Sequence, residues 1–160
     1  MNVAVLSGGV GGARFLRGLL GVVDPVNVSI VGNVADDLEV LGLRVSPDLD
    51  SILYTLTGLA DEERGWGRAG ESWHALETVA RLGGESWFRL GDLDIGLHLV
   101  RTQLLREGVP LSQATERLAH ALGLQAALLP ATVATCVEEP SAKTLSDARV
   151  TWARLLALFG

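Results

Sequence analysis

The sequence predicts an α/β protein with a Rossmann-like arrangement and a mainly parallel sheet. The apolar run 2–6 leads through a glycine-rich stretch into helical spacing over 13–20, and a β-rich run follows at 26–31. Several helix-like segments then separate this unit from a last β-rich run at 125–129. With 160 residues, of which 48% are hydrophobic and 20% charged, the chain has the size and composition of one globular domain.

The first forty residues predict a strand, a helix and a second strand. Residues 2–6 are apolar and are followed by glycines, which is typical of a buried strand, and 13–20 repeat apolar residues at helical spacing. Asp24-Pro25 interrupts the chain before the β-branched run 26–31. The loop after the first strand is therefore expected in the crevice where open parallel sheets bind ligands.

The next elements are mostly helical. A helix is expected to begin at Ser46 and Pro47, because serine is a common N-cap and proline is favoured at the first helical position. Its apolar face runs from Leu49 to Leu56, and a polar, glycine-containing loop follows over 58–70. Further helices are expected at about 72–82, at about 92–106 and from a Ser112 N-cap to Gly123, before the strand at 125–129.

The predicted domain ends near residue 130. Residues 131–150 are small and polar with little periodicity, and only 151–159 regain an apolar, helical pattern. We therefore expect a domain over 1–130 and a divergent C-terminal tail over 131–160. No internal repeat is evident.

Composition and charge narrow the classes of partner. The net charge is −6 and the 13 basic residues are scattered, which predicts no nucleic-acid partner and no membrane partner. Lys143 is the single lysine, so a cation in the first 140 positions must be an arginine. Cys136 is the single cysteine, which excludes an internal disulfide. With no signal-peptide or membrane-spanning pattern, we expect a cytoplasmic protein.

The glycine-rich stretch is a candidate phosphate site. Four of the five residues at positions 8–12 are glycine, and the predicted helix begins directly after them. A helix N-terminus offers unpaired N–H groups and a partial positive charge. A Walker loop would need Lys-Ser/Thr after its last glycine, where this chain has Ala13-Arg14. A phosphate-binding turn of another kind, with Arg14 directed at phosphate, and a turn without a ligand both stay open.

A dinucleotide site is disfavoured. The pattern Gly-x-Gly-x-x-Gly is met at Gly9 and Gly11 but fails at Arg14, where the third glycine should allow close packing of the helix. Asp36 or Asp37 nevertheless stands where the ribose-binding acid of such a site would be expected.

Acidic residues form three close pairs that are expected near the same crevice. Stabilisation by the helix dipole is sufficient reason for carboxylates at helix starts, at about 0.3–1 kcal/mol each. The alternative is that one or two of them hold Mg2+, which would allow a diphosphate to approach an acidic crevice. The pairs are Asp36 and Asp37, Asp48 and Asp50, and Asp92 and Asp94.

A charged helix face and the tryptophans each allow two interpretations. Asp94, His98 and Arg101 share one face of the helix expected at about 92–106, which predicts a solvated ion-pair face, with a catalytic or metal-binding His98 as the alternative. Tryptophans at such spacings are more often core residues, and the alternative is stacking on a flat heterocycle. These tryptophans are Trp66, Trp73 and Trp87.

Four stretches together resemble one family in order and spacing. That family is the 2-phospho-L-lactate transferases, called phosphoenolpyruvate transferases in actinobacteria, of coenzyme F420 biosynthesis. The resemblance covers about 2–130. The stretches are 7–19 with the glycines, 33–37 ending in Asp-Asp, 46–56 beginning Ser-Pro-Asp-Leu-Asp, and Gly65-Trp66-Gly67 leading to Phe-Arg-Leu-Gly-Asp-Leu-Asp at 88–94.

The resemblance implies a three-layer Rossmann-like fold, of which this chain is the N-terminal portion only, and a truncated or frameshifted member of the family. It also implies a Mg2+-dependent transfer of a phospholactyl or enolpyruvyl-phosphate group from a guanosine diphosphate carrier. The acceptor would be the ribityl hydroxyl of a 5-deazaflavin, 7,8-didemethyl-8-hydroxy-5-deazariboflavin, and GMP would be released. A homodimer is a further expectation.

Matching motifs assign roles to individual residues. Asp48 and Asp50 are the expected catalytic residues, and Asp50 with Arg89 would contact the deazaflavin. The expected metal ligands are Asp36, Asp37 and Asp48. The expected ligand-binding residues are Ser7, Gly8, Gly9, Gly11, Gly12, Arg14, Asn33, Asp50 and Arg89.

The chain departs from the family pattern at three positions. The family has threonine where Val10 and Val34 stand and arginine where Leu93 stands. A related group, the gluconeogenesis and cell-shape factors, shares the glycines and the Asp-Asp pair and binds a nucleotide sugar without turnover. That group continues with a Gly-Gly-Ser-Ser-Gly-like stretch, where this chain has Leu-Glu-Val-Leu-Gly at 38–42. The transferase is therefore the preferred hypothesis, and the binding protein is the alternative.

Overall fold

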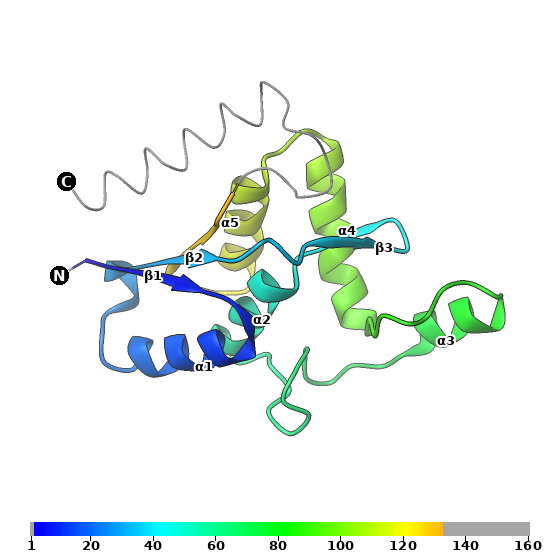
Figure 1. Cartoon of the computed structure of the whole chain (residues 1–160), viewed down its shortest axis with the longest axis horizontal. Coiled ribbons are helices and arrows are strands. Elements are labelled where there is room, and N and C mark those ends of the chain that lie inside the picture. Colours follow the sequence, from blue (N-terminus) through cyan, green and yellow to red (C-terminus); the bar gives the residue numbers. More distant parts are fainter. Residues whose placement is uncertain (1, 133–160) are drawn as a thin grey trace.

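The structure is a computed structural model that describes residues 2–132. Figure 1 shows a small sheet with helices packed around it. The expected helix at 151–159 and most of the expected tail lie outside the described residues. The elements in chain order are β1 (Val3–Ser7), α1 (Gly9–Leu20), a 3-10 turn (Pro25–Asn27), β2 (Val28–Gly32), β3 (Leu38–Val40), β4 (Leu43–Val45), α2 (Pro47–Leu56), α3 (His74–Arg81), α4 (Asp92–Arg106), α5 (Leu111–Ala121) and β5 (Ala127–Pro130).

The main sheet is parallel and has the strand order β1-β2-β5. Both crossovers advance in the same direction across the sheet, and right-handed crossovers of this kind place their helices on the same face. β2 is the middle strand and is buried along its whole length. The predicted α/β class and mainly parallel sheet are confirmed.

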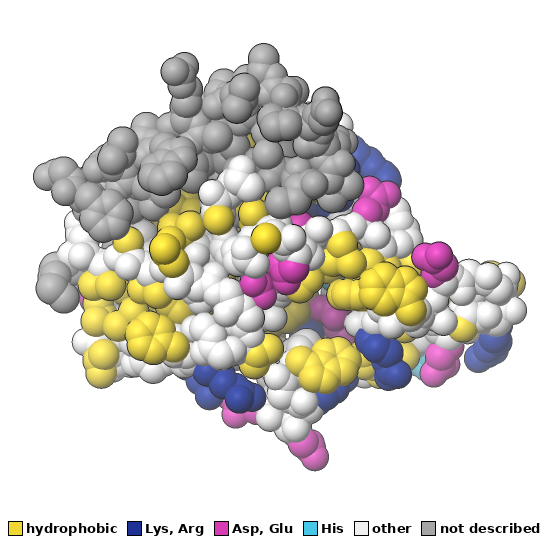
Figure 2. Space-filling view, viewed as in Figure 1, with side chains coloured by type: hydrophobic (Ala, Val, Ile, Leu, Met, Phe, Trp, Pro, Cys, Tyr) yellow, Lys and Arg dark blue, Asp and Glu magenta, His cyan; other side chains and the backbone are white. Residues whose placement is uncertain are grey.

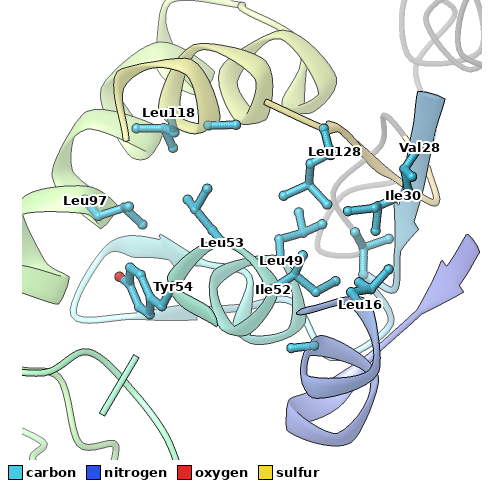
Figure 3. Close-up of a cluster of buried hydrophobic side chains, with 14 of the residues drawn as sticks. Leu16, Val28, Ile30, Leu49, Ile52, Leu53, Tyr54, Leu97, Leu118 and Leu128 are labelled. Atoms are coloured by element: carbon cyan, nitrogen blue, oxygen red, sulfur yellow. The ribbon is translucent and has the colours of Figure 1, made fainter. Parts of the chain in front are cut away.

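The core lies between that face and the helices. Figure 3 shows Leu16 of α1 and Leu49 and Ile52 of α2 beside Ile30 and Leu128 of the sheet. Successive residues of a strand point to opposite faces, so alternate residues of the sheet, such as Val28 and Ile30, meet the helical layer. On the opposite face Leu6 is 84% exposed. Among the described residues, the helical layer of this core covers one side of the sheet.

Several element boundaries differ from the sequence predictions. α1 begins at Gly9 and not at Ala13, so the glycines at 9–12 form its first turn. α5 begins at Leu111 with Pro110 as N-cap, and Ser112 therefore lies inside the helix. The hairpin of β3 and β4 was not predicted, because its strands are short and its turn, Leu41-Gly42, lacks the Asn-Gly signature of hairpin turns.

The helices α3 and α4 cap each other. The carboxylate of Asp92, at the start of α4, accepts hydrogen bonds from the Ser72 hydroxyl at 2.6 Å and from the His74 and Ala75 amides. In return, the Glu71 carboxylate accepts from the amides of Leu93 and Asp94 at 2.8 and 2.9 Å. Asp92 therefore stands in the first turn of α4, as expected, and its carboxylate also caps α3.

The prediction that the tryptophans are core residues is wrong for two of them. Trp87 is 67% exposed and Trp66 is 44% exposed. Trp73 is half-buried and directly precedes α3. In the described part of the chain, no helix combines the length and the hydropathy that crossing a membrane requires.

Candidate functional site

The starts of α1 and α2 meet at the carboxyl ends of β1 and β2. Asp48, in the first turn of α2, accepts a hydrogen bond from the Gly9 amide at 2.7 Å with Oδ1. Its other oxygen accepts from the side-chain amide of Asn33, just after β2, at 2.9 Å. We call this arrangement of Gly8, Gly9, Asn33 and Asp48 the cradle. It lies at the sheet edge where open parallel sheets bind ligands.

The structure shows which groups approach the glycines. A Cβ on Gly8 would lie 2.6 Å from Asp48 Oδ2, and a Cβ on Gly12 would lie 2.5 Å from Ser7 Oγ. Gly9 has φ +65°, a conformation that favours glycine. Only Gly11 has open space around the position of its Cβ. The fold itself therefore requires glycine at positions 8, 9 and 12, and Gly11 leaves space for a ligand.

The helix start in the cradle already holds an anionic side chain. The first amides of a helix have no partner within the helix and carry the positive end of its dipole. Gly8 is the N-cap of α1 and has no side chain that could accept from them, and the Asp48 carboxylate takes the Gly9 amide. A carboxylate oxygen thus lies where helix starts bind phosphate oxygens.

Two carboxylates are drawn together by one amide. The Asn33 side-chain nitrogen that donates to Asp48 also lies 3.4 Å from Asp36 Oδ1. Partial burial raises the pKa of Asp36, and the negative charge of Asp48 raises it further. These groups repel each other unless a proton or a cation lies between them.

Asp37 points elsewhere. Its Oδ2 accepts from the Ser46 hydroxyl at 2.9 Å, and its Oδ1 is buried and finds no hydrogen-bond partner within residues 2–132. Burial raises the pKa of Asp37 to about 7, although the Ser46 bond acts in the opposite direction. Ser46 is the N-cap of α2, as predicted, but its hydroxyl donates to Asp37 and accepts no hydrogen bond from the helix amides.

The expected metal ligands are only partly brought together. In 2–132, no three His, Cys, Asp or Glu side chains are arranged to hold a metal ion. Asp36 and Asp48 share Asn33, whereas Asp37 is turned to Ser46. Mg2+ commonly uses one or two protein carboxylates and leaves its other positions to water and phosphate. The Asp36 and Asp48 pair, with one carboxylate raising the pKa of the other, fits such an ion.

Asp50 lies away from the cradle, in a buried ion pair. Both of its oxygens accept from the Arg101 guanidinium, and Arg101 is 1% exposed. His98 Nδ1 lies 3.3 Å from Arg101 Nη1 and therefore acts as an acceptor in a neutral ring. Burial lowers the pKa of His98, and the Arg101 charge acts in the same direction.

The prediction of a solvated face on α4 is wrong. Asp94, His98 and Arg101 are all buried, because α4 turns this face towards α2. Asp94 accepts from the Tyr54 hydroxyl at 2.6 Å, beside the Asp50 and Arg101 pair. We call these five residues the α2–α4 network.

The remaining predicted residues are dispersed. The Arg89 guanidinium lies 4.7 Å from the centre of the Trp73 ring. Arg14 is exposed and lines a groove between α1, α2 and the loop after α2. Ser7 Oγ is buried beside Gly12, and no described residue forms a hydrogen bond with it. The structure thus brings Gly8, Gly9, Asn33, Asp36 and Asp48 together, while Asp50, Arg89 and Arg14 lie in other surroundings.

Sequence reasoning missed the role of Arg101 as the partner of Asp50. The signal that could have revealed it is Leu97, which lies on the same helical face between Asp94 and Arg101 and is buried. A charged face that also holds a core leucine is more consistent with a buried network than with a solvated surface.

Comparisons with known proteins point to one family. The family model described as 2-phospho-L-lactate transferase CofD matches residues 3–144. A phosphoenolpyruvate transferase of Streptomyces coelicolor is 50% identical over 119 residues, covering 74% of this chain and 37% of that protein. One of Nocardia farcinica is 49% identical over 136 residues, covering 84% and 41%. One of Mycobacterium tuberculosis is 49% identical over 150 residues, covering 85% and 45%.

The chain spans less than half the length of these relatives. The family match nevertheless extends over most of the chain and includes the cradle, the α2–α4 network and the groove. The chain therefore belongs to the CofD family of 2-phospho-L-lactate transferases.

Proposed function

We propose that this chain binds the donor in a transferase of coenzyme F420 biosynthesis. The donor is a guanosine diphosphate that carries an enolpyruvyl group, as the names of the relatives favour, or a lactyl group. The acceptor is the ribityl hydroxyl of a 5-deazaflavin, and GMP is released. The observation that carries the proposal is the cradle, where a helix start, the Asn33 amide and the Asp48 carboxylate meet, with Asp36 next to Asn33.

The chemistry is a displacement at phosphorus. The acceptor oxygen forms a bond to the phosphorus that carries the enolpyruvyl or lactyl group, and the bond from that phosphorus to the GMP oxygen breaks. Such a transfer needs positioning and charge stabilisation more than covalent help. The Gly9 amide is engaged by Asp48, and the later amides of the first turn of α1 are the proposed donors to phosphate oxygens, with room for them at Gly11.

The hydroxyl must also lose a proton. Within the proposal this proton passes to a carboxylate at the cradle, Asp36 or Asp48. Asp37 is not assigned this role, although burial raises its pKa to about 7, because one of its oxygens is buried and the other accepts from Ser46.

Asp36 and Asp48 are the residues that would hold Mg2+, and Asn33 orients both of them. The ion would neutralise charge on the diphosphate and between the two carboxylates. Asp50 acts as a positioning residue in this proposal, because both of its oxygens are engaged by Arg101. Arg89 remains the proposed contact of the deazaflavin.

The test is a calorimetric titration of the chain with GMP, with and without Mg2+. We expect Mg2+ to raise GMP affinity and Asp48→Ala to abolish most of that increase, because Asp48 is the carboxylate bound at the helix start. Asp24→Ala is the matched control, since Asp24 is an exposed carboxylate that bonds only the Val26 amide. GMP affinity without metal dependence, or an Asp48→Ala variant that retains it, would contradict the proposal.

A further inference from the structure

A groove of about 150 Å³ lies beside the cradle. Val10 and Arg14 line it from α1, Tyr54 lines it from α2, and Trp66 lines it from the loop that follows α2. Val10 belongs to the first turn of α1, so the groove begins next to the amides of the helix start. Arg17 also lines it and is seven residues further along α1, or about 10 Å along the helix.

The loop holds Trp66 in a defined position. Gly65 has φ +81° and Gly67 has φ +70°, so the chain turns immediately before and after Trp66. The Gly65 amide donates to the Asp61 carbonyl at 2.9 Å, and the Asp61 amide donates to the Gly67 carbonyl at 3.0 Å. The Gly-Trp-Gly motif thus presents a half-exposed indole at the wall of the groove.

A stacked arginine stiffens this wall. The Arg64 guanidinium lies 4.6 Å from the centre of the Trp66 ring and 5.4 Å from that of Trp73. It also donates to the carbonyls of Trp66 and Arg68, at 3.2 and 2.8 Å. These bonds hold the guanidinium over the indole and so restrain Trp66, which therefore loses little conformational entropy when it contacts a ligand.

The two cations of the groove differ. Arg17 forms an ion pair with Glu62, which links α1 to the loop. Arg14 forms no hydrogen bond or ion pair with any residue that the structure describes, and one of its nitrogens lies beside Gly65. On the face drawn in Figure 2, several basic side chains lie beside exposed hydrophobic side chains along the lower edge, below the sheet. A side chain with free N–H donors therefore stands next to an aromatic wall.

We propose that this groove binds a flat heteroaromatic ring that carries oxygen acceptors at its edge. Trp66 packs on the ring and Arg14 donates to its oxygen atoms, while the phosphate end of the same or the adjoining substrate lies at the start of α1. The inference rests on the proposed function, because guanine and the deazaflavin are both rings of this kind. Stacking on an aromatic side chain tolerates either ring.

The experiment titrates the chain separately with GMP and with the deazaflavin, following calorimetry for the first and ligand fluorescence for the second. We expect Trp66→Ala to weaken binding of at least one probe about tenfold, and Arg14→Gln to weaken the same probe. Trp87→Ala and Arg81→Gln are the matched controls, because both residues are exposed and lie outside the groove. Thermal unfolding by circular dichroism checks that all four variants fold.

The outcomes separate the two proposals. Weaker binding of GMP alone places guanine in the groove, and weaker binding of the deazaflavin alone places the acceptor there. If both probes bind Trp66→Ala and Arg14→Gln as they bind the unaltered chain, the groove proposal is overturned while the proposed function stands. If neither probe binds the unaltered chain, both proposals are overturned.

Discussion

Asp48 and Asp50 stand two positions apart in the first turn of α2 and meet opposite surroundings. Asp48 is half-buried at the cradle and is held by a backbone amide and by Asn33. Asp50 is 5% exposed and is held by the Arg101 guanidinium. Residues two positions apart on a helix do not share a face. One acidic motif therefore places one carboxylate at the cradle and the other in a buried ion pair with Arg101, which we call the clamp.

The largest expected effect concerns the clamp. Arg101→Met removes the guanidinium that engages both Asp50 oxygens and leaves only His98, 3.8 Å away, beside the buried charge, which should lower the free energy of unfolding by about 3–5 kcal/mol. Asp48→Ala removes two bonds at a half-exposed site, and the expected loss is smaller, about 1–3 kcal/mol. Urea denaturation measures both.

The double variant Asp50→Leu, Arg101→Met supplies the control, because replacing both charges removes the uncompensated one. We expect it to be more stable than Arg101→Met alone. A double variant at least as unstable as the sum of the two single variants would show that the pair is not a coupled clamp.

The next effect is the pH dependence of stability, in which His98 of the α2–α4 network and Asp37 beside Ser46 should differ. The pKa of His98 in the folded protein lies below 6.5, so the unfolded chain takes up its proton first and stability is lost as the pH falls below 6.5. The pKa of Asp37 is raised from 3.8 to about 7, so its contribution is fully present below about 3.8 and is lost as the pH rises towards 7.

Thermal unfolding from pH 4 to 8 should therefore respond in opposite ways to His98→Gln and Asp37→Asn. His98→Gln should remove the loss of stability that the unaltered chain shows below pH 6.5. Asp37→Asn should remove the loss that it shows as the pH rises towards 7. Parallel curves for the unaltered chain and for either variant would refute the corresponding assignment.

The smallest effect concerns two neighbouring glycines of α1. Gly11→Ala meets nothing within 4 Å and should stabilise the helix by up to about 1 kcal/mol, whereas Gly12→Ala forces a Cβ against Ser7 Oγ and should destabilise the fold. If Gly11 admits a phosphate, the more stable Gly11→Ala variant should also bind GMP more weakly. Unchanged GMP affinity in that variant would remove Gly11 from the proposed site.

The sequence was most informative where patterns are local. The strand and helix of 2–20 and the start at Ser46-Pro47 were predicted because apolar spacing and N-terminal residues act over a few positions. The burial of Arg101 was not predicted, because it depends on Asp50, which stands 51 positions earlier in the chain. The approach of Asp48 to Gly9 spans 39 positions and was also beyond local patterns.

The family resemblance named the residues of the cradle together with residues that lie elsewhere. It grouped Asp50 with Arg89, and the structure gives them different partners, Arg101 and Trp73. Glycines at 8 and 12 could be read as room for a ligand, whereas the side chains of Asp48 and Ser7 occupy that room. Which of the glycines can face a ligand depends on the tertiary structure and cannot be predicted from the sequence pattern.

The exchange of caps between Glu71 and Asp92 has a dynamic consequence. Eight residues are too few for a helix to persist by itself in water, so α3 depends on bonds from the neighbouring helix. Fraying of the first turn of α4 would release α3 with it, and the two segments would open as one unit in hydrogen exchange. The protection of the α3 amides therefore reports on the integrity of a junction and not on the helix alone.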